Sequence, residues 1–295
     1  MTHAKSALLP NRSVVRVSGE DAEKLLQGII TSDMELLAGR PAIHAALLTP
    51  QGKILFEFFV ARSSSGFLLD TAKGQAANLV KRLIMYKLRA KVDIRETGAE
   101  HVVMAVWGDD PQGPGGTGGA VSFPDPRLPE LGLRVLAETQ STTDIAAATN
   151  GMDADAQDYH AHRIALGVPE GGKDYAFGDT FPHEANLDLL HGVSFSKGCF
   201  VGQEVVSRMQ HRSTARKRIV IVEGSAPLQS GSEIIAGPAT IGTIGSVAGN
   251  RGLALVRLDR ADEMQRKGEQ LTAAGDAIAI RRPTYFTPAV PAEAS

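Results

Sequence analysis

Residues 197–204 read Lys-Gly-Cys-Phe-Val-Gly-Gln-Glu, the most informative stretch of the chain. It contains Cys199, the single cysteine among 295 residues, so no intrachain disulfide can form. A helix is predicted directly after it, because apolar side chains then recur on one helical face. The N-terminal end of that helix and the ammonium of Lys197 both favour the thiolate form of the cysteine. We therefore predict that Cys199 and Lys197 are catalytic; the alternative is a cysteine buried as a small apolar side chain.

A basic run follows the cysteine motif. Such a run can bind a polyglutamate tail, an RNA backbone or an acidic protein, and the alternative is a solvated connector. The run consists of Arg208, Arg212, Arg216, Lys217 and Arg218.

The region before the motif has the pattern of an α+β fold. Strand, helix, hairpin, strand, helix and strand follow one another, an order typical of an antiparallel sheet with helices on one face. One predicted helix spans about 75–89, with Ala76, Leu79, Val80, Leu83, Ile84 and Leu88 as its core stripe. A further helix is predicted at about 155–166, and strands at 14–17, 43–48, 54–60, 67–69, 92–94, 102–107 and 132–136.

Two composition changes divide the chain. Residues 108–119 are rich in glycine and predict a flexible loop inside the first region. From Arg218, short β-rich runs separated by Gly and Pro predict a small β-barrel. We expect an α+β region at 1–213, the barrel at 214–285 and a disordered tail at 286–295.

Overall composition narrows the class of protein. Lys plus Arg total 31 and Asp plus Glu total 33, giving a net charge of −2 that argues against a globally basic nucleic-acid binder. No apolar run approaches the ~18 residues that span a bilayer, and the first residues are too short for a signal peptide. The sequence therefore predicts a soluble, cytoplasmic protein with no membrane partner.

The cysteine motif closely resembles a family signature. KGCFVGQE is similar to the Lys-Gly-Cys-[Phe/Tyr]-x-Gly-Gln-Glu signature of the YgfZ branch of the YgfZ/GcvT superfamily, which includes iron–sulfur assembly factors. Members of the superfamily resemble the folate-using T-protein of the glycine cleavage system. Other segments that resemble this family are 26–33, 45–53, 182–188 and 191–195.

The resemblance implies a fold and a ligand. The fold would be two interleaved, ferredoxin-like α+β domains and a C-terminal β-barrel around a central opening. The opening would hold tetrahydrofolate or a related reduced folate. Glu184 would hold the pterin ring, since a carboxylate accepts two hydrogen bonds from a pterin edge. Arg163, Gln203 and Arg208 would be further folate-binding residues, and surface snorkelling is the alternative for Arg163.

The resemblance also implies a function. It predicts a folate-binding accessory protein for assembly or repair of iron–sulfur enzymes, with Cys199 as the working thiol. Its partners would be iron–sulfur client or assembly proteins, and it would not be a classical enzyme.

Two alternative functions and one alternative site remain open. A folate-dependent aminomethyltransferase or demethylase needs a positioned carboxylate; Glu57 is available, but Phe56 stands where part of an acidic pair is expected. A tRNA-modification-associated protein would bind RNA weakly through the basic run. Metal ligation by His183, His191 and Cys199 follows no recognised zinc spacing, so no resident metal is predicted.

Overall fold

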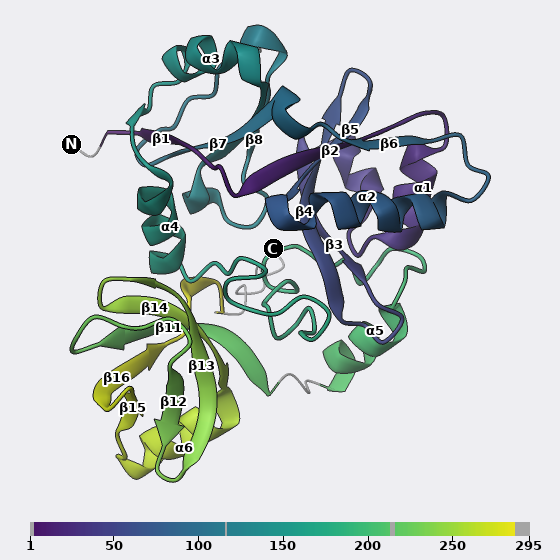
Figure 1. Cartoon of the computed structure of the whole chain (residues 1–295). Coiled ribbons are helices and arrows are strands. Elements are labelled where there is room, and N and C mark those ends of the chain that lie inside the picture. The colour runs from purple at the N-terminus through teal and green to yellow at the C-terminus, as the bar shows by residue number, and fades with distance from the viewer. Residues whose placement is uncertain (1–2, 116, 213–215, 287–295) are drawn as a thin grey trace, which may run out of the picture.

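The computed structural model describes residues 3–115, 117–212 and 216–286. This part of the chain forms two five-stranded sheets and a closed six-stranded barrel (Figure 1). The predicted α+β class with a C-terminal barrel is confirmed. Phe286 ends a short 3-10 helix, η6 (Thr284–Phe286), while the rest of the predicted disordered tail lies outside the described residues.

The first sheet carries both of its helices on one face, as the sequence pattern predicts. Its strand order is β3-β4-β5-β2-β6, and all neighbouring pairs are antiparallel. Helices α1 (Ala22–Ile29) and α2 (Lys73–Lys87) bury Leu26, Leu79 and Leu83 in one core against the sheet. The strands are β2 (Arg12–Ser18), β3 (Ala42–Leu48), β4 (Ile54–Ser63), β5 (Gly66–Ala72) and β6 (Asp93–Glu96).

The second sheet is interleaved with the first along the chain. Its order is β10-β1-β7-β9-β8, so the chain begins in this sheet, builds the first sheet, and then returns. A core that joins the two sheets contains Phe59, Trp107 and Phe123. The elements are β1 (Lys5–Leu8), β7 (His101–Trp107), β8 (Val121–Pro124), β9 (Leu133–Glu138), α3 (Thr142–Ala148), β10 (Met152–Asp153) and α4 (Ala156–Ala165).

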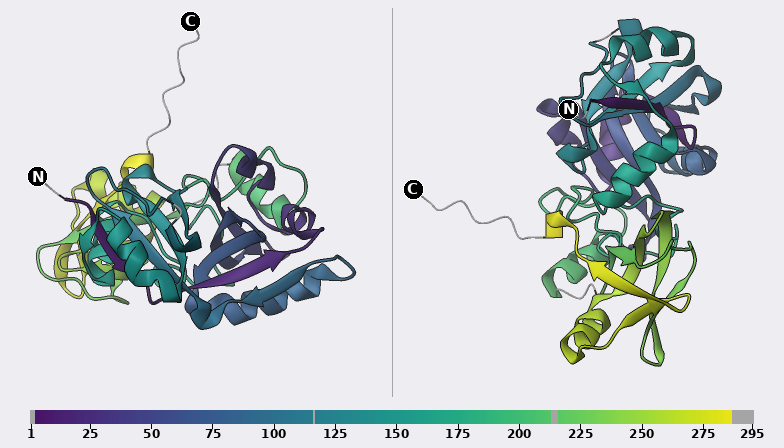
Figure 2. Two further views of the ribbon diagram at one scale, coloured as in Figure 1. Left: turned by 90° about the horizontal axis from the view of Figure 1, so that it is seen from above. Right: turned by 90° about the vertical axis from the view of Figure 1, so that its left-hand side faces the viewer.

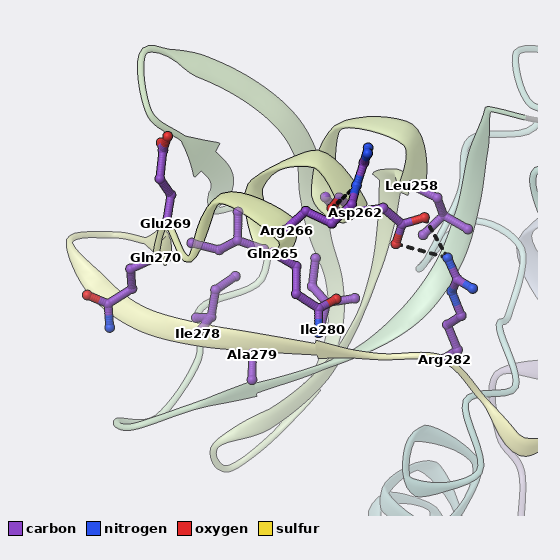
Figure 3. Close-up of a pocket in the computed structure, with 12 residues that line it drawn as sticks. Leu258, Asp262, Gln265, Arg266, Glu269, Gln270, Ile278, Ala279, Ile280 and Arg282 are labelled. Atoms are coloured by element: carbon purple, nitrogen blue, oxygen red, sulfur yellow. Dashed lines mark hydrogen bonds and ion pairs between the residues drawn. The ribbon is translucent and has the colours of Figure 1, made fainter.

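The C-terminal barrel has the strand order β11-β14-β13-β12-β15-β16. It also contains α6 (Leu258–Lys267), a helix that the sequence pattern did not predict; Gly268 ends it in the left-handed conformation. Between α6 and β16 lies a groove of about 840 Å³, and Arg282 pairs with Asp262 at its rim (Figure 3). The strands are β11 (Lys217–Gly224), β12 (Glu233–Ala236), β13 (Ala239–Ala248), β14 (Arg251–Arg257), β15 (Leu271–Ala273) and β16 (Asp276–Arg281).

Part of the predicted core stripe of α2 faces solvent instead. Ala76, Leu79 and Leu83 are buried as predicted, but Ile84 is 51 % exposed and Leu88 is 86 % exposed. The prediction is wrong for these two residues because the helix is apolar on more than one face near its end, and only one face contacts the sheet.

The long loop 169–194 connects the first sheet to the barrel. Successive hydrogen-bonded turns fold it, and Figure 1 shows it between β3 and β11. Its Thr180 carbonyl accepts from Ile54 N of β4 at 2.9 Å, while Asn186 donates to the Ile219 carbonyl of β11 at 2.9 Å. The loop therefore fixes the barrel to the sheet. Among the described residues, no helix is long and apolar enough to cross a membrane.

Candidate functional site: an exposed cysteine between two anchors

Cys199 lies exposed on a loop whose neighbouring residues are buried. Lys197 is 7 % exposed, and Phe200 is also 7 % exposed. Phe200 packs in the core that joins the sheet, the long loop and the barrel. The thiol is therefore held at the surface by an anchor on each side, and the alternative of a buried, inert cysteine is excluded.

Lys197 anchors the loop to the end of α1. Its ammonium donates to the carbonyls of Gln27 at 2.7 Å, Ile30 at 2.8 Å and Ser32 at 2.9 Å. An ammonium has three N–H donors, so all of them are used by the backbone. Burial lowers the pKa of Lys197 from 10.5 to about 8, and the charge of Asp33 opposes this shift. The geometry makes Lys197 a positioning residue, which departs from the catalytic role predicted for it.

Two motif glycines bring separate segments of the sequence together. Gly202 has φ +80°, and a Cβ there would lie 2.5 Å from the Thr49 carbonyl oxygen. Gly52 has φ +81°, and a Cβ there would lie 2.9 Å from Cβ of Val205. Both positions therefore require glycine, because the tight turn after β3 packs directly against the start of α5 (Gln203–Arg212). This contact fixes the far side of the cysteine loop.

Two residues predicted to bind folate lie on α5: Arg208 is exposed and Gln203 is half-buried. Arg208 forms an ion pair with Glu204, one helical turn earlier, and both side chains are exposed. The Gln203 side chain has no hydrogen-bond partner among the described residues. Gln203 and Arg208 thus follow the thiol by four and nine residues, and Arg208 is exposed to another molecule.

Glu184 caps a turn of the long loop. Its Oε2 accepts a hydrogen bond from the Phe181 backbone at 3.0 Å. Nearby, Arg218 of the basic run binds both carboxylate oxygens of Asp188, at 2.6 and 2.8 Å, and donates to the His183 carbonyl. Arg218 therefore connects loop and barrel, so it is not available to an RNA backbone.

Arg163 is enclosed in the interior, where it is 1 % exposed. It donates to Asp174 Oδ2 at 2.7 Å, to Ser246 Oγ at 2.7 Å and to the Val168 carbonyl at 3.0 Å. Its burial rules out surface snorkelling. These partners join α4 to the long loop and to β13 of the barrel, which gives Arg163 a structural role.

Glu57 is buried on β4 and fully engaged. Oε1 accepts from His44 Nε2 at 2.9 Å, and Oε2 accepts from the Tyr175 hydroxyl at 2.5 Å and from Gly171 N at 3.3 Å. Burial acts to raise the pKa of Glu57, but His44, Arg127 and Tyr175 together lower it to about 2. A carboxylate held in this way has no position from which to meet a substrate.

An arginine–carboxylate network fills the junction of the two sheets. Arg127 binds both oxygens of Asp125, at 3.0 and 2.7 Å, and Arg134 donates to Asp125 Oδ2 at 3.3 Å. Beside this network lies a cavity of about 10 Å³, lined in part by Arg134 and Tyr159. That volume suits one water molecule. This cavity is therefore too small for a pterin, and Glu184, the residue predicted to hold the pterin ring, does not line it.

The alternative metal site would consist of His183, His191 and Cys199. His183 binds Gln210 through Nε2 at 3.0 Å, while its buried Nδ1 has no partner among the described residues. Within that same part of the chain, no group of three His, Cys, Asp or Glu side chains is placed to hold a metal ion.

The sequence did not reveal the buried polar network around Glu57. His44 lies on the neighbouring strand β3, whereas Tyr175 and Arg127 come from distant segments, and each sits in a stretch whose pattern indicates only a strand or a loop. Glu57 itself gives the one signal available, as a lone carboxylate within the apolar strand 54–60. Its partners become apparent only in three dimensions.

The chain is similar in sequence to one known protein family and to several known proteins. Residues 216–288 match the family described as CAF17, C-terminal beta-barrel domain. The chain is 37 % identical over 229 residues to a protein of Mycosarcoma maydis named iron-sulfur cluster assembly factor IBA57 homolog, mitochondrial. That match includes 73 % of this chain and 56 % of the relative, so the chain spans about half of the fungal protein. It is 33 % identical to the human iron-sulfur cluster assembly factor IBA57, mitochondrial, across 84 % of this chain and 76 % of the human protein.

A solved structure shows the same fold. The crystal structure of glycine cleavage system aminomethyltransferase T from Bartonella henselae superposes with a TM-score of 0.76, over 97 % of this chain and 86 % of that one. The sequences are 16 % identical, so the likeness is one of fold alone. The sequence relatives contradict the prediction of a cytoplasmic protein. The fungal and human proteins are both named as mitochondrial.

Proposed function

Because the chain belongs to the IBA57 family of iron–sulfur cluster assembly factors, we propose that it supplies Cys199 as a ligand to a cluster that it shares transiently with a partner protein. The supporting observation is an exposed thiol held between the buried residues Lys197 and Phe200. A single cysteine cannot hold a cluster alone, since such clusters use several thiolates, so the partner would supply the rest.

The ligation step needs no change of oxidation state in the protein. The Cys199 thiol loses its proton to solvent, and the thiolate sulfur then donates an electron pair to one iron of the cluster. Release reverses the step when a client protein offers its own thiolates. Helix α5 begins four residues after the thiol, and its half-buried Gln203 and exposed Arg208 would meet the partner.

Folate binding is a separate part of the proposal. The likeness in fold to an aminomethyltransferase supports it, whereas the 10 Å³ cavity opposes binding at the junction in this conformation. We therefore assign folate no part in cluster ligation. Titration of the protein with tetrahydrofolate by calorimetry tests binding directly, and heat of binding that disappears in Glu184→Gln would establish the pterin contact.

The transferase and RNA alternatives have less support. Glu57 is held inside the protein by His44 and Tyr175, so it is not placed as a transfer base. In the basic run, Arg218 and Arg208 already have carboxylate partners.

The test of the proposed function uses cells that lack their own family member. Expression of this chain is expected to restore the activity of iron–sulfur enzymes, and Cys199→Ala is expected to abolish this rescue while thermal unfolding stays unchanged. Ser196→Ala, in the same exposed loop, is the matched control and should restore activity fully. Full rescue by Cys199→Ala would reject the thiol as a cluster ligand.

A further inference from the structure

The outer face of α2 is an unusual surface for a folded protein. Ile84 is 51 % exposed, Met85 65 % and Leu88 86 %, and they are three of the seven exposed large apolar side chains among the described residues. Ile84 and Met85 lie on the side of the helix away from the buried Leu79 and Leu83, and Leu88 follows directly after the last helical residue, Lys87. Apolar side chains gathered in this way mark an interaction site more often than scattered ones do.

The backbone leaves the helical conformation at Leu88, the residue that follows α2. Leu88 has φ +48°, a conformation that is strained for a residue with a branched side chain. Figure 1 shows the end of α2 and its connection to β6 at the margin of the molecule farthest from the barrel. Figure 2 shows the same helix along the outer edge when the molecule is seen from above. The tip therefore lies at the edge of the molecule and is accessible.

The surroundings of the tip are strongly positive. Residues 73–92 contain six Lys or Arg and no Asp or Glu, in a chain whose net charge is −2. Lys91 pairs with Glu20, but Lys81, Arg82, Lys87 and Arg89 have no carboxylate partner among the described residues. Lys81 shares the exposed apolar side, while Arg82 and Lys87 flank it. This local charge is complementary to an anionic surface.

We propose that the tip of α2 is a docking site for an anionic phospholipid surface. Ile84, Met85 and Leu88 would enter the boundary between headgroups and acyl chains, and the flanking cations would bind lipid phosphates. The long Lys and Arg stems can reach upward past the inserted side chains. The site lies on a different element from Cys199, so it goes beyond the proposed function and departs from the expectation of no membrane partner.

Two other occupants fit less well. A second copy of the chain would place this positive surface against an identical one, and like charges repel. A protein partner normally buries about 20 residues on each side of a stable interface, whereas the apolar part of this tip has three. A bilayer, in contrast, accepts a small apolar tip when charges assist it.

Vesicle flotation with the full-length protein tests this assignment. The protein should bind vesicles of mixed phosphatidylcholine and phosphatidylglycerol at low salt, bind pure phosphatidylcholine weakly, and dissociate at high salt because screening weakens the phosphate contacts. Each of Lys81→Gln and Arg89→Gln should lower the partition coefficient roughly fivefold. Replacing Ile84, Met85 and Leu88 by Ser should lower it roughly tenfold per side chain.

The control is Met152→Ser, which changes an exposed apolar side chain on the second sheet and should leave binding unchanged. Circular dichroism should report the same fold for every variant, since the substituted side chains are exposed. Failure to bind anionic vesicles, or binding that the triple Ser variant retains, overturns the proposal. Binding to soluble poly-glutamate without binding to vesicles also overturns it, and would favour an acidic protein partner.

Discussion

At the scale of single residues, Lys197 has two possible roles: to hold the cysteine loop in place, or to activate the thiol with its positive charge. The sequence places an ammonium two residues before the thiol, which predicts activation of the thiol. The structure shows that ammonium bound by three backbone carbonyls at the end of α1. The buried ammonium therefore fixes the position of the thiol. Each of the three carbonyls would lack a hydrogen-bond donor without it.

Removing the Lys197 ammonium should release the loop. Lys197→Met leaves three carbonyls without their donor, so we expect a loss of about 2–4 kcal/mol in the free energy of unfolding and faster proteolysis within the loop. Urea unfolding and limited trypsin digestion measure the two effects.

The matched control for this variant is Lys91→Met, which removes an exposed ion pair with Glu20 and should change stability by less than about 1 kcal/mol. Equal stability of Lys197→Met and the native protein would contradict the anchoring role.

At the scale of elements, the turn after β3 and the start of α5 form one unit. Gly52 and Gly202 belong to separate segments of the sequence, yet each occupies the space that a side chain at the other would need. The predicted strands and turns identify each segment by its own pattern. Neither sequence pattern predicts the contact between the two segments, because the contact depends on how the long loop folds back on β4.

Substitution of the second glycine should disturb this contact. Gly202→Ala forces a Cβ to within 2.5 Å of the Thr49 carbonyl oxygen at a positive φ, so we expect a destabilisation of about 1–3 kcal/mol. Gly198→Ala is the control in the same motif, because a Cβ there meets nothing within 4 Å. Chemical denaturation of both variants makes the comparison, and equal effects would contradict the packing argument.

At the scale of the whole molecule, buried carboxylates hold the two sheets and the barrel together. Glu57, Asp125 and Glu170 lie in the junction, and burial would raise their pKa values. Neighbouring groups outweigh burial and lower each pKa to about 2. Arg127 does so for Asp125 and Arg163 for Glu170, while His44 and the Tyr175 hydroxyl do so for Glu57. The ionised form is therefore part of the folded state.

This arrangement predicts sensitivity to acid. A carboxyl group whose pKa is lower in the folded than in the unfolded chain adds stability above its unfolded value, and that stability is lost as the pH falls. For Glu57 the window runs from about 4.5 down to about 2, with a loss on the order of 3 kcal/mol.

Urea unfolding at a series of pH values measures the loss. Glu57→Gln should make the acid dependence less steep, while Glu35→Gln, which removes an exposed carboxylate, should leave the slope unchanged. An acid dependence that is identical in the native protein and Glu57→Gln would contradict the role of this carboxylate.

Much of the architecture follows from the sequence, whereas less of the site does. The nearly continuous apolar runs at 43–48 and 54–60 and the Gly-separated β runs after Arg218 predict the strands correctly. The sequence pattern does not predict helix α6, because most of its residues are charged and few apolar side chains mark its buried face. Arg163 carries a charge that usually faces solvent, so its burial depends on Asp174 and Ser246, which only the folded chain brings near.

The most direct test of the central claim is protection of Cys199 by a shared cluster. The free protein should react with iodoacetamide at one site per chain, because its single cysteine is exposed. After anaerobic mixing with a cluster-loaded assembly partner, mass spectrometry should find that site unmodified, and removal of iron by a chelator should restore labelling. Labelling at the same rate with and without the cluster would contradict the claim that this sulfur binds iron.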